Sequence, residues 1–185
     1  MTSLVIFCSA IILTGLLIIG GYNNGVKLRN YVREAFSTMD VYLKKRWDLI
    51  PNLVETVKGY AEHENDLLEK LTELRNTGYS TMSDSQKLEA NSELTKVLSR
   101  LIAVAENYPD LKANQNFMQL SDELSSIETD IANSRKYYNG TVRELNTFLE
   151  VFPTNIIGSV FGFQKEKLFE ITESERQNVK VSFND

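Results

Sequence analysis

The residues best suited to chemistry lie in one stretch, LKKRWDLIPNLVETVKGYAEHE, which spans residues 43–64. It holds a basic triplet at residues 44–46, the only Trp, Trp47, and the only His, His63. A His between two Glu residues has the ligand types of a divalent-metal site, and a basic cluster beside an aromatic ring suits anionic lipid or a protein partner. The stretch therefore admits three interpretations: an active or metal site, a membrane-docking surface, and the corner of a helical bundle.

The chain lacks the residues that a catalytic or metal-binding bundle needs. A di-iron bundle uses carboxylates from several helices and two Glu-x-x-His pairs, whereas this chain has one His. Its one Cys, Cys8, rules out a disulfide within the chain and a clustered Cys/His zinc site. No Gly-x-Ser-x-Gly elbow or phosphate-binding Gly loop occurs. We expect no cofactor, no metal and no enzymatic activity, and a metal-binding or enzymatic bundle centred on His63 is the alternative.

Charged residues on or beside the apolar seams form a second group of interest. A charge that faces a helical core is costly unless it is paired, so a polar layer that fixes helix register is the leading interpretation, and a ligand or partner site is the alternative. If the first helix runs straight from Tyr22, Lys45 lies about 35 Å beyond it, too far for lipid contact. The candidate partner surface or polar layer comprises Asp40, Lys44, Lys45, Arg46, Trp47, Asp48, Glu106, Glu128 and Arg135.

An uncharged run at residues 2–26 precedes all of these positions. Residues 4–22 are apolar and long enough to cross a bilayer core, which takes about 20 helical residues, so we expect them to contact membrane lipid. No Lys or Arg precedes them, unlike a cleaved secretory signal, which favours an uncleaved transmembrane anchor. The flanking basic residues all follow the span, which predicts a single-pass cell-membrane protein with its N-terminus outside and its bundle in the cytoplasm. They are Lys27, Arg29, Arg33, Lys44, Lys45 and Arg46.

Beyond the anchor, apolar residues recur at alternating spacings of three and four, which predicts amphipathic helices packed on one another. Pro51 interrupts the first, so either one helix is kinked or two helices meet at a corner, where Asp48 can cap the second. Ser83 and Gln86 predict a capping box at the start of the next long helix. The last long helix, starting at residue 110 or 114 and ending at 149, keeps its seam through Gly140.

The C-terminal part differs in character. Residues 154–163 are apolar and too short to cross a membrane, yet suited to lie on one or to pack on the end of the bundle. Residues 164–185 are rich in charge, and we expect low order there, with residues 179–183 as an apolar docking segment. The predicted domains are an anchor at 1–24, a helical bundle at 25–153, and an apolar segment and tail at 154–185.

Charge and aromatic content bear on the partners. A formal net charge of −5 argues against binding of nucleic acid, which usually requires a basic surface. Six aromatic residues fall off or beside the seams, and aromatic residues are enriched in protein interfaces, so we expect self-association in the membrane. The alternative is that several of them widen the core. They are Tyr31, Phe36, Trp47, Tyr79, Tyr108 and Phe148.

Four stretches in order resemble the signature segments of the LemA family: MDVYLKKRWDLIPNLVETVKGYAEHE, AENYPDLKAN, IETDIANSRKYYN and FPTNIIGSVFGFQKEKLFE. The resemblance covers nearly the whole chain from Tyr22 onward; Gly140 and Leu145 depart from the pattern. It implies a bacterial membrane protein with one N-terminal span, N-terminus outside, and an up-and-down helical bundle. It brings no established catalytic residues. Members are often encoded beside membrane-associated proteases or envelope proteins, which implies a membrane or envelope protein partner, a protease among the candidates.

The expected fold class is all-α, with an N-terminal transmembrane helix followed by an up-and-down bundle of three to four long helices with coiled-coil-like seams. The expected function is that of a membrane-anchored scaffold or adaptor that acts through protein contacts. An oligomeric protein that remodels membranes shares the same sequence features and is the first alternative. The metal-binding or enzymatic bundle centred on His63 is the second.

Overall fold

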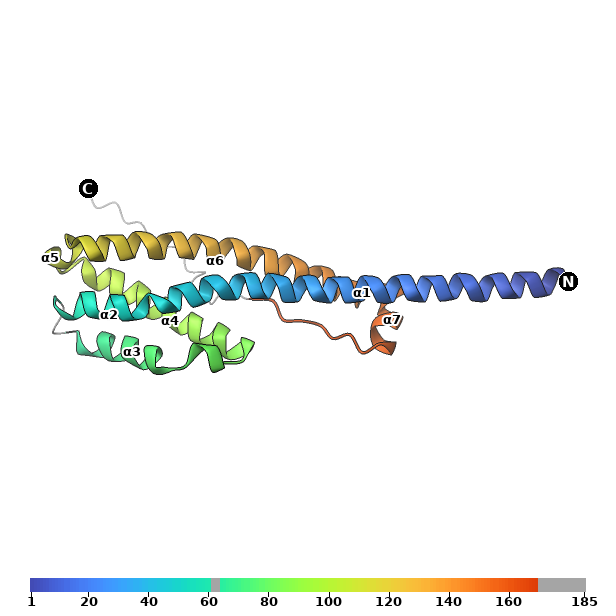
Figure 1. Cartoon of the computed structure of the whole chain (residues 1–185), viewed down its shortest axis with the longest axis horizontal. Coiled ribbons are helices and arrows are strands. Elements are labelled where there is room, and N and C mark those ends of the chain that lie inside the picture. Colours follow the sequence, from blue (N-terminus) through green and yellow to red (C-terminus); the bar gives the residue numbers. More distant parts are fainter. Residues whose placement is uncertain (61–63, 170–185) are drawn as a thin grey trace, which may run out of the picture. The chain divides into compact units, whose positions relative to one another are not determined.

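The chain folds into helices joined by short segments, as the computed structural model in Figure 1 shows. The structure describes residues 1–60 and 64–169, and no strand occurs among them. The all-α prediction is confirmed, with a long apolar helix at the N-terminus followed by several more. The elements are α1 (Thr2–Asp48), α2 (Ile50–Lys58), α3 (Asn65–Asn76), the 3₁₀ turn η1 (Tyr79–Thr81), α4 (Asp84–Ala105), α5 (Pro109–Lys112), α6 (Gln115–Phe148) and α7 (Thr154–Val160).

These elements belong to two compact units. Of the described residues, the first unit contains 1–39 and 133–169, and the second contains 40–60 and 64–132. The two longest helices, α1 and α6, each contribute to both units. The predicted limits of anchor, bundle and tail follow a different criterion, namely apolar and charged composition, and stay predictions.

The first half of α1 carries apolar side chains that no other part of the chain covers. Leu4, Ile12 and Leu16 are each more than 60% exposed, and the apolar window has a mean hydropathy of 2.6 with none of its residues buried. A helix that exposes so much apolar surface needs an apolar environment. By length and composition α1 is able to cross a membrane, and it is the one such helix among the described residues.

The corner at Pro51 consists of two helices separated by one residue. α1 ends at Asp48 and α2 begins at Ile50, while Leu49 between them keeps a helical backbone with φ −77° and ψ −19°. Pro51 lies in the first turn of α2, where its missing N–H costs no helical hydrogen bond. The expectation that Asp48 caps α2 is wrong, since no side chain caps this helix and the Asp48 carboxylate pairs with Lys44 instead.

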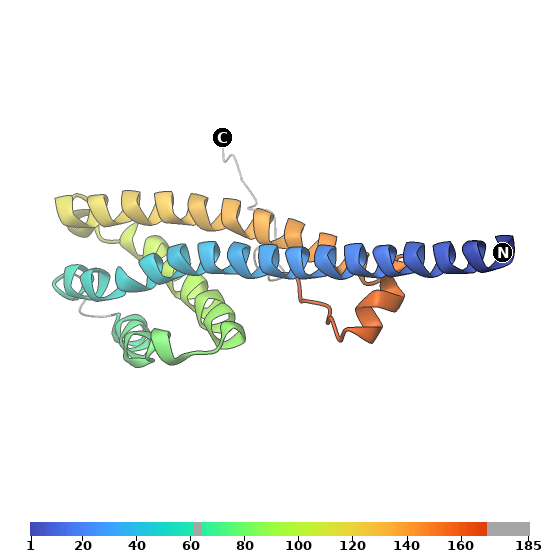
Figure 2. The same ribbon diagram turned by 45° about the vertical axis from the view of Figure 1, so that its right-hand side comes forward.

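The core of the second unit lies among α2, α3, α4 and the first half of α6. Figures 1 and 2 both show α3 beside α2, and the buried side chains of α2 are those of its apolar stripe. The capping box predicted for α4 is confirmed: Ser83 N donates to Gln86 Oε1 at 2.9 Å, and Gln86 N donates to Ser83 Oγ at 3.4 Å. In the second unit, the Leu and Ile side chains with at most 2% exposure are Leu43, Ile50, Leu53, Leu67, Leu71, Leu94, Leu101, Leu111 and Ile131.

The first unit packs the later half of α1 against the end of α6. Ala35 and Val142 are fully buried, and the rings of Phe36 and Tyr138 meet edge to face with centroids 5.9 Å apart. Gly140 lies inside α6 without interrupting it, as the continuous seam predicted. Burying the large residues of this seam outweighs the roughly 1 kcal/mol that an internal Gly costs relative to Ala.

The segment after α6 folds back onto the first unit. α7 buries Ile157 and Gly158, and a Cβ on Gly21 of α1 would lie 2.2 Å from Ile157 Cδ1, so a larger residue at position 21 would require the end of the Ile157 side chain to move. The expectation of low order from residue 164 is wrong for residues 164–169, here called the strap, because α6 side chains hydrogen-bond its backbone. The predicted docking segment at 179–183 lies outside the described residues.

Candidate functional site

Arg46 is the centre of a buried polar network in the second unit. Its side chain is 1% exposed, because the seam of α1 turns this position toward α4 and α6. The guanidinium Nη1 donates to Glu128 Oε1 at 2.6 Å and to Thr95 Oγ1 at 3.0 Å. Nη2 donates to the carbonyl oxygen and to Oδ1 of Asn91, each at 3.0 Å. Four acceptors, one of them a carboxylate oxygen, thus offset the cost of burying the cation.

A second cluster surrounds Asp40, two turns before Arg46 on α1. Asp40 Oδ1 accepts from Tyr79 Oη at 2.8 Å, and Oδ2 accepts from Lys87 Nζ at 2.6 Å. Burial, and next the hydrogen bond to Asp40, raise the pKa of the Tyr79 phenol above its usual value, so Tyr79 stays protonated and donates. The ammonium of Lys87 also lies 5.4 Å from the centre of the Tyr79 ring.

Asn91 joins the two clusters into one network. Its Oδ1 accepts from Arg46, and its Nδ2 donates to the Lys87 carbonyl oxygen at 2.9 Å and approaches Tyr79 Oη at 3.4 Å. Trp47 covers the network, since its ring is 6% exposed and lies 5.3 Å from the Tyr79 ring. The network therefore links α1, η1, α4 and α6 and fixes how these elements register against one another.

The remaining sequence-predicted residues lie elsewhere. Lys44 and Asp48 pair with each other on the surface, and Lys45 Nζ stands 5.5 Å from the Tyr42 ring centre. Glu106 pairs with Lys112 at 2.6 Å, and both side chains are more than half exposed. Arg135 belongs to the first unit, where its guanidinium lies 4.2 Å from the ring centre of Phe169.

Four of the nine candidates thus come together: Asp40, Arg46, Trp47 and Glu128. Sequence reasoning missed their partners Tyr79, Asn91 and Lys87. Tyr79 follows a Gly in a short loop, and Asn91 is a polar residue at a position where the apolar period of α4 points inward. That inward polar position is the signal that could have found Asn91.

The network is suited to holding the helices in register rather than to catalysing a reaction. Its donors are engaged by neighbouring acceptors of the same unit, apart from Arg46 Nε, which has no hydrogen-bond partner. Across residues 1–60 and 64–169, no cluster of three His, Cys, Asp or Glu side chains could hold a metal ion. His63, on which the metal alternative rests, lies outside the described residues.

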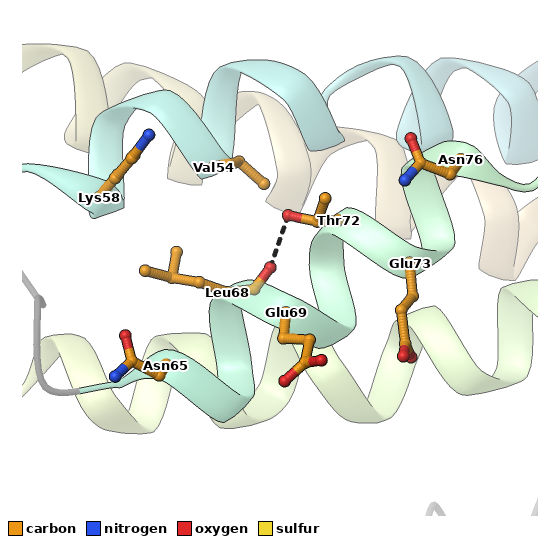
Figure 3. Close-up of a pocket in the computed structure, with 8 residues that line it drawn as sticks. All are labelled: Val54, Lys58, Asn65, Leu68, Glu69, Thr72, Glu73 and Asn76. Atoms are coloured by element: carbon orange, nitrogen blue, oxygen red, sulfur yellow. Dashed lines mark hydrogen bonds between the residues drawn. The ribbon is translucent and has the colours of Figure 1, made fainter.

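An open groove lies between α2 and α3 in the second unit. Figure 3 shows Leu68 of α3 and Val54 of α2 lining it, while the Thr72 hydroxyl donates to the Leu68 carbonyl oxygen at 2.7 Å. Lys58 and Glu69 also line it. The hydrogen bond of Thr72 is local to its own helix, so nothing in the groove converges on a reacting group.

A second feature that sequence reasoning missed is the way α6 holds the strap. Asn139 exchanges two hydrogen bonds with the backbone of Phe169, at 3.0 Å and 2.8 Å, and Asn146 does the same with Glu166, at 2.9 Å and 3.0 Å. Between them the Tyr138 hydroxyl donates to the Lys167 carbonyl oxygen at 3.0 Å. Asn139 and Asn146 are seven residues apart and therefore share one face of α6. Each amide bonds both the N–H and the carbonyl oxygen of one strap residue, as a neighbouring β-strand would.

The sequence model of the LemA family matches residues 35–183. Protein LemA of Metamycoplasma hominis is 27% identical over 165 residues, which cover 89% of this chain and 75% of that protein. Magnetosome protein MamQ 2 of Paramagnetospirillum magneticum is 22% identical over 175 residues, and Magnetosome protein MamQ of Magnetospirillum gryphiswaldense is 20% identical over 174. Both matches cover 80% of this chain but only 64% of the relative. The apolar part of α1 precedes the family match, so its properties are argued from this chain alone.

Proposed function

Because the chain belongs to the LemA family, as its four motifs predicted, we propose that it is a membrane-anchored scaffold or adaptor that acts through protein contacts. The observation that carries the proposal is the continuity of α1. One helix exposes its large apolar side chains over residues 4–19 and then contributes Ala35, Met39 and Leu43 to packed cores. Such a helix ties a folded helical region to a bilayer without a flexible linker.

The proposed orientation places the N-terminus outside and the packed helices in the cytoplasm. The support is the distribution of charge: Lys27, Arg29 and Arg33 follow the span within one membrane-proximal stretch, and no basic residue precedes it. This side of the membrane would expose the surface pair Lys44–Asp48 and the neighbouring Lys45 to cytoplasmic proteins. The partner we propose is a membrane or envelope protein, with a membrane-associated protease as one candidate class.

The proposal of self-association loses part of its sequence support. Of the six aromatic residues placed off or beside the seams by sequence, three are each 5–6% exposed and belong to the cores: Trp47, Tyr79 and Phe148. Tyr31 is exposed at 36%, and Phe36 packs on Tyr138. What remains in favour of a homo-oligomer is the exposed apolar surface of the first unit, which a second copy or lipid can cover.

A scaffold is favoured over an enzyme because the polar groups around Arg46 and Asp40, apart from Arg46 Nε, form hydrogen bonds with one another. An activity centred on His63 would predict stoichiometric metal in the purified protein and its loss in His63→Ala. Metal analysis of the two proteins separates the classes, since bound metal that disappears with His63 would remove the scaffold-only proposal.

Membrane remodelling by oligomers is the remaining alternative, and the exposed apolar surface of the first unit is the feature that favours it. Liposomes mixed with full-length protein test it. Visible curvature or tubes would replace the adaptor proposal with remodelling, whereas liposomes of unchanged shape support the adaptor.

The orientation is tested by cysteine labelling of intact cells. With Cys8→Ser as background, Ser80→Cys places a thiol on η1, where residue 80 is exposed. A membrane-impermeant reagent should label it only after permeabilisation. A matched cysteine at Met1 should label without permeabilisation, because that terminus is proposed to lie outside. The reverse pattern would overturn the orientation.

A further inference from the structure

The connection from α6 through α7 exposes an apolar face beside the exit of the membrane span. Residues 151–163 contain no charged side chain, although the segment is short and largely exposed. Phe152 is 79% exposed, Val160 72% and Ile156 54%, while Ile157 and Gly158 on the opposite side of α7 are buried. Ile156 and Val160 are four residues apart and share one face of the helix. α7 thus exposes apolar side chains on its outward face as well as burying them on its inward face.

The level of this face along α1 follows from three contacts inside the first unit. At Gly25 a Cβ would lie 3.0 Å from the rings of both Phe148 and Phe163. Phe148, at the end of α6, and Phe163, after α7, therefore both lie against α1 at the level of Gly25. Ile157, between these two points, reaches Gly21. Gly21 precedes Gly25 by one turn, which is about 6 Å of helix toward the N-terminus. Figure 2 shows α7 beside α1 at this place.

Charge marks the same boundary from both sides. The uncharged run of α1 stops at Lys27, and the uncharged segment around α7 is bracketed by Glu150 and Lys165, which pair at 2.6 Å. The guanidinium of Arg29 lies 5.3 Å from the ring centre of Phe163. The charged residues of α1 therefore begin at Lys27, two residues after Gly25, whereas Ile157 of α7 reaches α1 at Gly21, on the apolar side of that level.

Tyr22 occupies the position of an interfacial aromatic anchor. It is 40% exposed, its ring lies 4.8 Å from that of Phe161, and it follows the last strongly apolar residues of α1. Tyr at the end of a span marks the headgroup level of a bilayer. A helix whose apolar face lies at that level is expected to enter the headgroup and acyl boundary by about 5–10 Å.

We propose that α7 and the turn before it insert Phe152, Ile156 and Val160 into the lipid interface on the side of the membrane where α1 emerges. The protein then contacts one leaflet at two places, through the span and through α7, and the first unit is seated on the bilayer rather than held away from it. The proposal rests on the proposed membrane span, because only a bilayer around residues 4–22 brings lipid to this level. The occupant is lipid rather than a protein because the face continues the apolar surface of α1 and ends at the same charge boundary.

Depth-dependent quenching in nanodiscs tests this with the full-length chain. In a Cys8→Ser background, an environment-sensitive dye is attached to Ile156→Cys or Val160→Cys, to Leu13→Cys within the span, and to Lys136→Cys, an exposed position of α6 in the first unit. The expected result is a blue-shifted emission that spin-labelled lipids quench at positions 13, 156 and 160. The dye at 136 should emit as in water and stay unquenched.

Each other outcome overturns a different statement. Quenching at position 13 with emission at 156 and 160 like that at 136 would remove the interfacial insertion and leave the span intact. Blue-shifted emission at 156 and 160 that lipid quenchers do not reach would assign the face to a protein contact, a second copy included, and also remove it. Absence of quenching at position 13 would overturn the span, and the insertion with it.

Discussion

Removing the carboxylate of Glu128 should destabilise the second unit more than removing Arg46, the residue that pairs with it. In Glu128→Leu the Arg46 guanidinium keeps its three neutral acceptors but loses its only carboxylate, while it stays 1% exposed. Breaking a buried ion pair from one side costs about 3–5 kcal/mol when both partners are inaccessible. The Glu128 side chain is 40% exposed, so water reaches the edge of the pair. We therefore expect a smaller loss, about 2–3 kcal/mol of unfolding free energy.

The opposite substitution, Arg46→Met, removes the charge instead of stranding it. Glu128 then turns to water, and the Thr95 hydroxyl, which also loses its bond from Arg46, still donates to the Asn91 carbonyl oxygen at 2.9 Å. Asn91 Oδ1 is the one fully buried acceptor of the four that is left without a bond from Arg46 or Thr95. One unsatisfied buried acceptor costs about 1–3 kcal/mol, and the apolar Met side chain recovers part of that. The expected cost is about 1–2 kcal/mol.

A double-mutant cycle isolates the pair. Because the stranded charge is absent once Arg46 is replaced, Arg46→Met/Glu128→Leu should lie close to Arg46→Met alone, with a coupling energy of about 2 kcal/mol. Urea unfolding of the full-length protein in detergent, followed by far-UV circular dichroism, gives the values. Lys44→Ala is the control, since its surface pair should contribute less than about 1 kcal/mol. Additive effects, or a Glu128→Leu loss as small as that of Lys44→Ala, would refute the argument that Arg46 is a buried charge held by one carboxylate.

Three further predictions follow from the packing, the phenol and the strap. Ile131→Ala, 1% exposed on α6, should cost about 2–5 kcal/mol in urea unfolding, whereas Met118→Ala, 51% exposed on the same helix, should cost less than about 1; equal effects would show that the seam is not where we place it. The raised pKa of Tyr79 means that the folded state holds the phenol proton more tightly, so stability should fall as pH rises above about 10, and Tyr79→Phe should flatten that fall in unfolding measured between about pH 8 and about pH 11; an unchanged slope would contradict it. Asn146→Ala removes two hydrogen bonds to the strap and should speed tryptic cleavage near Lys165 about tenfold. The control is Glu144→Ala, a substitution at an exposed position of the same helix. Equal cleavage rates in the two variants would mean that the Asn146 side chain does not hold the strap.

Much of the fold follows from local sequence signals, and the residues show why. Ser83 and Gln86 carry their capping box within three residues, and the seam through Gly140 repeats often enough to outweigh one weak helix former. Such features need only neighbours along the chain. Asp48 failed as a cap for a related reason: α2 begins one residue after α1 ends, so the backbone between them never leaves helical angles and no extended cap position exists.

The site and the strap depend on partners far apart in sequence, which periodicity cannot pair. Arg46 meets Glu128 across 82 positions and Asn91 across 45, and nothing in the local pattern of either residue names the other. The strap resembles a disordered tail in composition because three of its six side chains are charged. Its order comes from Asn139 and Asn146, whose amides bind its backbone. Because nearly every residue has the same backbone groups, the sequence does not show which of them a side chain will bind.

The scaffold proposal predicts that the protein contacts specific partners in its own membrane. The most direct test is mass measurement of the full-length protein in nanodiscs combined with in-cell photo-crosslinking from Lys44, whose side chain is 43% exposed beside the basic cluster. The account predicts a discrete adduct with a membrane or envelope protein or with a second copy, absent when the crosslinker is moved to Lys96, an exposed position on α4. A monomeric mass together with no adduct from either position would contradict the claim that this chain is a membrane-anchored scaffold.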